Sequence, residues 1–280
     1  MRIFGYKGPG ISISHFWDNA NTPNKRQMHT HTFLELYVFL GGKASFHVDG
    51  TIYSLVSGDI LLFRPNEGHK IVVDPEIPYD RVVINFDANL FSAIDPEKQL
   101  TRPFFDRKLA TLNLYHKDIF PAQQFDTLLN GMLESSKGNR TVILANLILF
   151  LTQISEAFVN HTPNTNDTTI EQRILQYINK NLHRDLDILS ICEKFHISKA
   201  TLFRLCKNAT GISVSKYIRM KRLLLCHMLI EEGEKPTRIF ATYGFQDYSS
   251  FYRAYVKQFG YSPHAKGFLA IESTHAVNDD

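Results

Sequence analysis

The sequence predicts an α+β protein of two domains, in which a small β-barrel or β-sandwich with following helices precedes an all-helical domain. Between residues 11 and 86, short apolar runs alternate with turn signals, which is typical of small β-domains. After residue 168 only helical spacings occur, and one pattern occurs there twice: Leu-Phe-Arg at 202–204 before Gly-Ile-Ser at 211–213, and Phe-Tyr-Arg at 251–253 before Gly-Tyr-Ser at 260–262. A chain of 280 residues is long enough to build two separate cores.

The N-terminal strands include residues 34–40, 44–48 and 60–63, each of which ends at a turn. Asp49-Gly50 between apolar runs is a strong signal for a two-residue hairpin. Side chains alternate along a strand, so Glu35, Tyr37 and Phe39 share one face of the first strand. We expect this face to line the lumen of the barrel.

The segment from 122 to 160 has helical spacing and is apolar on more than one face. Its main apolar stripe consists of Leu144, Leu147, Leu151, Ile154 and Phe158. A helix of this kind needs two packing partners. One is the barrel, and the second is either the same helix of another subunit, over residues 142–158, or more of the chain's own core.

Residues 161–168 form a polar stretch that contains Pro163 and no large apolar side chain, as is typical of a linker. We therefore expect one domain at 1–161 and a second at 168–280.

The second domain is predicted to contain two helix-turn-helix units, with helices at 170–182, 188–195, 198–208, 214–232, 237–243 and 249–259. In such a unit the second helix enters the major groove of DNA. In the first unit Ser198 is the expected N-cap of the second helix, and Leu202, Leu205 and Cys206 face inward. The opposite face carries the expected DNA contacts Lys199, Ala200, Phe203, Arg204 and Lys207.

The second unit repeats this plan. Pro236 opens its first helix, and Asp247 is the expected cap of its second helix. That second helix is expected to present Tyr248, Ser249, Tyr252 and Arg253 to DNA. The helix over 214–232 joins the units as a rigid strut, so both would contact one face of a duplex at sites about 34 Å, or 10 base pairs, apart.

Basic charge is concentrated in the second domain. Residues 1–167 carry 15 Lys and Arg against 17 Asp and Glu, whereas 168–280 carry 16 against 11. Seven basic residues between Ser198 and Arg222 occur without an acidic one, which indicates either phosphate contacts or a solvated basic face. The three cysteines form no CxxC pair, and no apolar leader opens the chain, so we expect a soluble cytoplasmic protein without a membrane segment.

Residues 170–267 resemble the DNA-binding domain of the AraC/XylS family of transcription regulators. The resemblance rests above all on Gly-Phe-Gln-Asp-Tyr-Ser-Ser-Phe at 244–251 and Phe-Gly-Tyr-Ser-Pro at 259–263. It implies a preceding cupin-like domain for effector binding and dimerisation, and base-reading positions at Ala200, Phe203 and Arg204 and at the four residues named in the second unit. Phe240 stands where the family prefers Ala, so we expect altered packing in the second unit.

The N-terminal region is similar to a cupin barrel, a fold that holds small ligands in its mouth. His29, His31, Glu35 and His69 resemble the metal-ligand set of cupin enzymes, and imidazole with carboxylate suits a first-row divalent metal. The same pattern occurs in the regulator family without implying a metal. We therefore expect an effector pocket at these residues, with neither metal nor cofactor.

A sugar is the expected effector. A Trp ring can stack on a pyranose face while Arg and Glu bond its hydroxyls, and Trp17 serves equally well as core packing. The predicted effector contacts are Trp17, His29, His31, Glu35, Tyr37, Arg64 and His69.

These patterns predict a transcription regulator that binds double-stranded DNA at promoter half-sites and responds to a small molecule. It is expected to form a homodimer and to have no catalytic activity, since no catalytic Ser/His/Asp order, phosphate-binding loop or dinucleotide motif occurs. RNA polymerase is a further candidate partner. Two alternatives remain open: a metal-dependent cupin enzyme with an attached DNA-binding module, and a DNA-binding protein whose barrel only dimerises.

Overall fold

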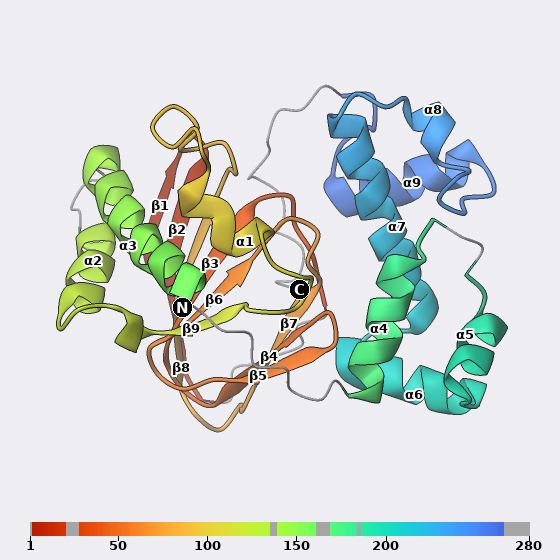
Figure 1. Cartoon of the computed structure of the whole chain (residues 1–280), viewed down its shortest axis with the longest axis horizontal. Coiled ribbons are helices and arrows are strands. Elements are labelled where there is room, and N and C mark those ends of the chain that lie inside the picture. The colour runs from red at the N-terminus through yellow and green to blue at the C-terminus, as the bar shows by residue number, and fades with distance from the viewer. Residues whose placement is uncertain (1, 21–27, 135–138, 161–168, 184–185, 266–280) are drawn as a thin grey trace. The chain divides into compact units, whose positions relative to one another are not determined.

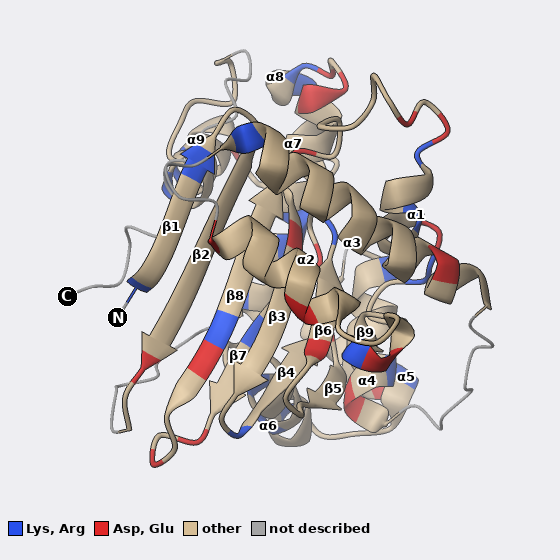
Figure 2. Ribbon diagram, turned by 90° about the vertical axis from the view of Figure 1, so that its left-hand side faces the viewer, with Lys and Arg blue, Asp and Glu red and all other residues tan. Residues whose placement is uncertain are grey.

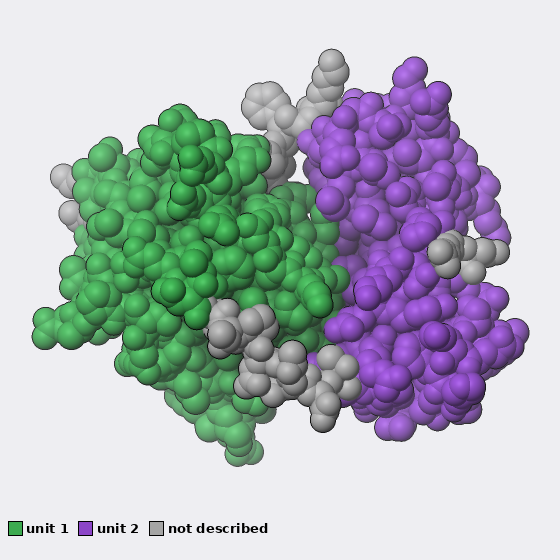
Figure 3. Space-filling model, in the orientation of Figure 1, with its two compact units in different colours: residues 1–26, 30–166 green, residues 27–29, 167–280 purple. Residues whose placement is uncertain are grey.

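The computed structural model describes residues 2–20, 28–134, 139–160, 169–183 and 186–265 (Figure 1). The chain divides into two compact units, which Figure 3 colours separately: residues 1–26 with 30–166, and residues 27–29 with 167–280. The predicted linker at 161–168 lies outside the described residues.

The N-terminal unit contains two antiparallel sheets. The larger has the order β1-β2-β8-β3-β6-β9 and the smaller the order β5-β4-β7. The predicted hairpin is confirmed, since Val48 pairs with Thr51 across Asp49 and Gly50, both of which have positive φ. The strands are β1 (Arg2–Gly8), β2 (Ile11–Asp18), β3 (Leu34–Gly41), β4 (Ala44–Val48), β5 (Thr51–Ser54), β6 (Asp59–Phe63), β7 (His69–Val73), β8 (Tyr79–Phe86) and β9 (Leu114–His116).

Each face of the larger sheet has its own core because side chains alternate along its strands. Leu36 and Val38 of β3 belong to a core that includes buried residues of two helices, α2 (Gln124–Leu133) and α3 (Arg140–Asn160). Tyr37 and Phe39 belong to a second core with Phe46 and other residues of the smaller sheet. The face of β3 that was predicted to line the lumen therefore points toward the smaller sheet, where its side chains pack in this second core.

Helices α2 and α3 lie across the larger sheet, and the ribbon of α3 is nearly free of charged residues (Figure 2). Leu147, Leu151 and Ile154 of the predicted stripe are fully buried, so this stripe packs into the unit's own core. The opposite side of α3 still exposes Val142, Leu149 and Val159. Helix α3 is long and apolar enough to cross a membrane, but the core helices of soluble proteins can be equally long and apolar. Shorter elements complete the unit: η1 (Gln99–Thr101), α1 (Arg102–Phe105) and η2 (Lys117–Ile119).

The described part of the C-terminal unit is helical. The helices are α4 (Ile170–Lys180), α5 (Ile188–Phe195), α6 (Lys199–Thr210), α7 (Val214–Glu231), α8 (Pro236–Ile239) and α9 (Tyr248–Phe259). They agree with the predicted ranges except that α8 ends after one turn, where 237–243 was predicted. Hydrogen-bonded turns continue the chain from Phe240 to Gly244.

Two hydrophobic clusters hold this unit together. One contains buried residues of α4, α5, α6 and the first half of α7, and the other joins the second half of α7 to α8 and α9. Helix α7 therefore contributes to both helix-turn-helix cores, as expected of a strut. The cysteines are buried within these clusters, and burial raises the pKa of Cys206 and of Cys226 to about 12. They act as small apolar side chains.

Candidate functional sites

Helix α6 has the boundaries and faces of a DNA-recognition helix. The Ser198 hydroxyl accepts a hydrogen bond from the Thr201 amide at its start, and Gly211 ends it with a φ of 78°. Leu202, Leu205 and Cys206 are buried, as predicted. The five predicted contact residues are all exposed, and Phe203 is 47% exposed although it is aromatic. They are Lys199, Ala200, Phe203, Arg204 and Lys207.

Helix α9 has the same design. The Asp247 carboxylate accepts a hydrogen bond from the Ser250 amide, and Gly260 ends the helix with a φ of 79°. Ser249, Tyr252 and Arg253 are exposed, as predicted for base contacts.

Tyr248 differs from the other predicted contacts because it is half-buried. Its ring packs edge-on against Phe240, with ring centroids 5.7 Å apart, and its hydroxyl lies 2.6 Å from Nε2 of His264. Phe240 thus fills space beside α9 that a smaller residue would leave open, and Phe251 also contacts it. Tyr248 is thus held between Phe240 and His264, and a change in packing caused by Phe240 stays a prediction.

The basic residues between Ser198 and Arg222 do not all face solvent. Lys216 and Arg219 on α7 are exposed, in addition to the basic side chains of α6. Lys221 is buried and Arg222 is half-buried, with its Nε donating to the carbonyl oxygen of Leu182. The last two residues of the basic run therefore have structural roles, and the remaining five are available to contact DNA phosphates.

A buried histidine lies in the core beneath α9, and no sequence pattern indicated it. Nδ1 of His227 lies 2.7 Å from the Tyr255 hydroxyl, and the imidazole stacks on Phe259 with centroids 4.4 Å apart. Burial lowers the pKa of His227 to about 4. This histidine is therefore neutral near pH 7.

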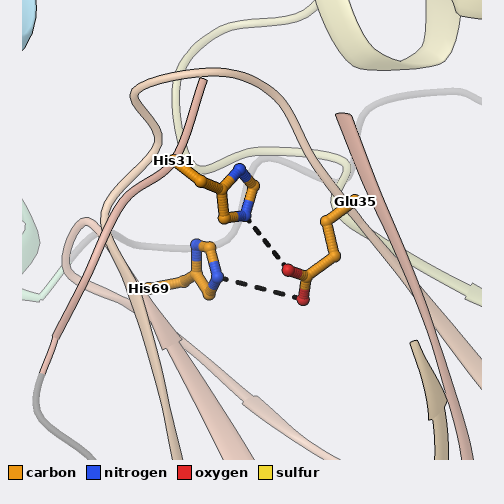
Figure 4. Close-up of side chains that lie close together, drawn as sticks. All are labelled: His31, Glu35 and His69. Carbon is orange, nitrogen blue, oxygen red and sulfur yellow. Dashed lines mark ion pairs between the residues drawn. The ribbon is translucent and has the colours of Figure 1, made fainter. Parts of the chain in front are cut away.

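In the N-terminal unit, three of the predicted effector contacts converge to form a His-Glu-His cluster, His31, Glu35 and His69 (Figure 4). Nε2 of His31 lies 3.1 Å from one carboxylate oxygen of Glu35, and Nε2 of His69 lies 3.9 Å from the other. The side chains are 3%, 9% and 0% exposed in that order. His31 and Glu35 are four residues apart, with Glu35 on β3 of the larger sheet, whereas His69 is the first residue of β7 in the smaller sheet. Packing of the two sheets against each other brings His69 to the other two residues.

Aromatic rings fix the two imidazoles. His31 stacks on Phe33 at a centroid distance of 4.1 Å, and His69 stacks on Phe63 at 4.0 Å. Tyr37, on the same face of β3 as Glu35, is buried, and its hydroxyl bonds that of Tyr79, a residue that the sequence did not single out.

The remaining predicted effector contacts are not part of the cluster. His29 is exposed. Trp17 is 39% exposed, and its indole N–H donates to Asn19. Because side chains alternate along β2, Trp17 lies on the same face of the larger sheet as Ile13 and His15, the face that the helices cover. Glu35 and Tyr37 lie on the opposite face. The structure thus supports neither the stacking role nor the core role considered for Trp17.

Arg64 is half-buried and turned toward the segment after α1. Its Nη1 donates to the carbonyl oxygens of Arg107 and Phe105, at 3.2 and 3.5 Å. These bonds give the guanidinium a structural role beside the lumen.

A buried ion pair that sequence reasoning missed supports the same region. Arg107 donates to both carboxylate oxygens of Glu67, at 2.8 and 2.6 Å, and both side chains are fully buried. The Glu67 carboxylate also accepts from the Ala110 amide and from Asn113. Burial by itself would raise the pKa of Glu67, but the charge and hydrogen bonds of Arg107 hold it below its ordinary value. The partners are 40 residues apart, and no local pattern connects them.

Comparisons with known proteins bear on both units. A family model described as "AraC-like ligand binding domain" matches residues 18–151, and one described as "Helix-turn-helix domain" matches 191–266. The Msm operon regulatory protein of Streptococcus mutans is 22% identical over 232 residues, which cover 81% of each chain. The multiple antibiotic resistance protein MarA of Salmonella typhimurium is 31% identical over 102 residues, covering 36% of this chain and 80% of MarA. The crystal structure of ToxT from Vibrio cholerae aligns over 91% of this chain and 96% of ToxT, at 14% identity and a TM-score of 0.40.

Proposed function

The chain belongs to the AraC family of transcription regulators, DNA-binding proteins with a ligand-binding domain, and on this premise we propose that α6 and α9 read its promoter half-sites. The observation that carries the proposal is that each helix runs from a side-chain cap to a glycine and exposes an aromatic residue beside an arginine. Phe203 and Ala200 can contact thymine methyl groups, while Arg204 and Arg253 supply polar contacts to bases.

The two helices are suited to recognise different base sequences. The α6 face is apolar around one arginine, whereas α9 offers the hydroxyls of Ser249 and Tyr252 together with Arg253. Because Tyr248 packs against Phe240 and bonds His264, its hydroxyl is less available to a base. Base discrimination at the α9 site therefore rests on the three exposed side chains.

Arg253→Ala is expected to weaken binding to the specific site by about 1–3 kcal/mol and to relax preference at one base position. Lys216→Ala, the matched control on α7, is expected to weaken binding to all DNA sequences by the same factor. It should also reduce the slope of log affinity against log salt concentration by about one. Fluorescence anisotropy with the operator and with single-base variants, at several salt concentrations, measures both. If the two variants behave alike, Arg253 does not read a base.

The effector is a sugar that binds in the lumen beside the His-Glu-His cluster. The carboxylate of Glu35 and the two imidazoles offer hydrogen bonds to hydroxyl groups, and the surrounding aromatic rings offer apolar faces. Sugar binding would bias the arrangement of the two units and so change which half-sites a dimer spans. The protein acts in the cytoplasm, and its function involves no catalytic step.

Operator affinity measured with and without a panel of monosaccharides tests the effector. We expect one sugar to change the affinity by about 5- to 150-fold and to raise the melting temperature. Glu35→Gln is expected to abolish this response while leaving operator binding in the absence of sugar intact, because DNA contacts lie in the other unit. Operator binding that ignores every sugar would instead favour a barrel that only dimerises.

Two subunits pair by packing the exposed side of α3 of one subunit against the same side of α3 of the other. Val142, Leu149 and Val159 remain exposed there after the main stripe has packed into the core. Apolar side chains repeated along one helix face are suited to a symmetric contact with a second copy.

A further inference from the structure

The His-Glu-His cluster contains a combination of side chains that can bind a metal ion, and binding of an effector does not require this combination. Among the described residues, it is the one group of three or more His, Cys, Asp or Glu whose ligand atoms lie within 4.8 Å of one another. Two imidazole nitrogens and one carboxylate form the combination found in metal sites that leave coordination positions open.

Backbone hydrogen bonds determine which imidazole nitrogens face the carboxylate. Nδ1 of His31 lies 2.9 Å from the carbonyl oxygen of Phe33, and Nδ1 of His69 lies 2.9 Å from that of Glu67. A carbonyl oxygen only accepts hydrogen bonds, so both Nδ1 atoms carry a proton and donate it. Each histidine then directs Nε2 toward Glu35, and bonding of the other ring nitrogen to a backbone carbonyl is the usual second interaction of metal-bound histidine.

Burial strengthens this interpretation. The side chain of Glu35 is 9% exposed, and a cation bound beside its carboxylate would be attracted more strongly than at the protein surface, because little water screens the charges. Stacking on Phe33 and Phe63 holds both imidazoles in place, which lowers the entropic cost of binding an ion. His116 offers a contrast at the surface, since it lies beside Asp59 and Asp118 but is 33% exposed.

We propose that His31, Glu35 and His69 bind one first-row divalent metal ion through the two Nε2 atoms and the carboxylate. Metal–ligand bonds of about 2.1 Å place neighbouring ligand atoms about 3.0–3.4 Å apart. Nε2 of His31 lies 3.1 Å from one oxygen of Glu35, which fits this range, and Nε2 of His69 lies 3.9 Å from the other oxygen. All three ligand atoms lie within 4.8 Å of one another, so binding a single ion requires the side chains to move closer together. The sequence favoured no metal, but only the fold shows that three of the four candidate ligands meet.

Three protein ligands leave positions open for oxygen atoms of water or of a small molecule. The metal would therefore provide an anchor within the lumen of the regulator. With the metal bound, the two Nε2 atoms and the carboxylate would bind the ion, and a sugar hydroxyl would bind an open position on the metal in place of these side chains. The metal proposal rests on the geometry of the cluster and does not depend on the identity of the effector.

The test uses the full chain after treatment with a chelator. Zn²⁺, titrated in competition with a chromophoric chelator, is expected to bind at one ion per chain and to raise the melting temperature. Co²⁺ is expected to give visible d–d absorption without a thiolate charge-transfer band, because the cluster contains no cysteine. Glu35→Gln and His69→Ala are expected to lower the affinity for Zn²⁺ by at least about 10-fold.

His116→Ala is the matched control and is expected to bind Zn²⁺ as the wild type does. Circular dichroism separates loss of the site from loss of the fold, and Glu35→Gln keeps the shape of the side chain. The proposal is overturned if neither ion binds, if a thiolate band appears, or if binding is equally strong in Glu35→Gln and His69→Ala. Operator affinity measured on the same samples distinguishes this outcome from failure of the regulator function.

Discussion

At the scale of single residues, Glu67 and Arg107 form a buried ion pair that stabilises the N-terminal unit. Their ion pair ties the turn after β6 to the segment that follows α1, and Asn113 completes the network. A charged pair that is fully buried requires both members, because the charge left behind after removal of one has no compensation. The neighbouring Ala110 is held at a φ of 58° and donates its amide to Glu67.

Glu67→Gln is expected to lower the free energy of unfolding of the N-terminal unit by about 3–5 kcal/mol, because it leaves the Arg107 charge uncompensated. Urea unfolding followed by tryptophan fluorescence measures this unit alone, since Trp17 is the only tryptophan of the chain. Arg102→Ala, which breaks the exposed ion pair with Asp106, is the control and should cost under about 1 kcal/mol. Similar losses in the two variants would contradict a structural role for the buried pair.

At the scale of elements, the two helix-turn-helix units share a plan and differ in their cores. Both recognition helices run from a side-chain cap to a glycine with positive φ. The core beneath α6 is mainly aliphatic, whereas the core beneath α9 contains many aromatic rings and the buried His227. Protonation of His227 is therefore expected to destabilise the second unit at acidic pH.

The stability of the second unit is expected to fall as the pH is lowered from about 6.5 to about 4. The pKa of His227 is about 4 in the folded chain and about 6.5 when unfolded, so the unfolded chain binds a proton that the folded chain excludes. The loss between pH 7 and pH 5 is on the order of 2 kcal/mol. Thermal unfolding followed by far-ultraviolet circular dichroism at these two pH values measures it.

His227→Gln keeps a polar partner for the Tyr255 hydroxyl and removes the titrating group, so most of this pH dependence should disappear. His183→Gln is the control because His183 is exposed in the same unit. A wild-type pH dependence that survives in His227→Gln would assign it to other groups.

At the scale of the whole molecule, α3 belongs both to the core of the N-terminal unit and to the proposed subunit contact. One side of α3 packs on the larger sheet, and the other side carries the exposed residues proposed as the subunit contact. A ligand that changes the packing of the sheet can thereby influence the contact between subunits, because both use the same helix.

Leu149→Glu is expected to convert a dimer into a monomer without unfolding the chain, since Leu149 is 51% exposed. Sedimentation equilibrium of the full chain measures the molecular mass. Ile94→Glu places the same charge at another exposed apolar position and is expected to leave the dimer intact. A Leu149→Glu protein that remains dimeric would show that the subunits pair elsewhere.

The sequence by itself determined the local features of this protein. Helix ends follow from Ser198, Asp247 and the two glycines because caps act within one turn of the chain. The exposed face of α6 and the lumen face of β3 follow from the periods of helix and strand. The family can be recognised from sequence motifs that occur in a fixed order, without any knowledge of the structure.

The tertiary structure decided every feature that depends on contacts between distant segments. It joined Glu67 to Arg107, enclosed His227, partly buried Tyr248 and directed the main stripe of α3 into the core. It also separated Trp17 from the predicted effector contacts and brought His31, Glu35 and His69 together. The physical reason is that burial and pairing across many residues are set by packing of the whole domain, whereas sequence patterns record only local periodicity.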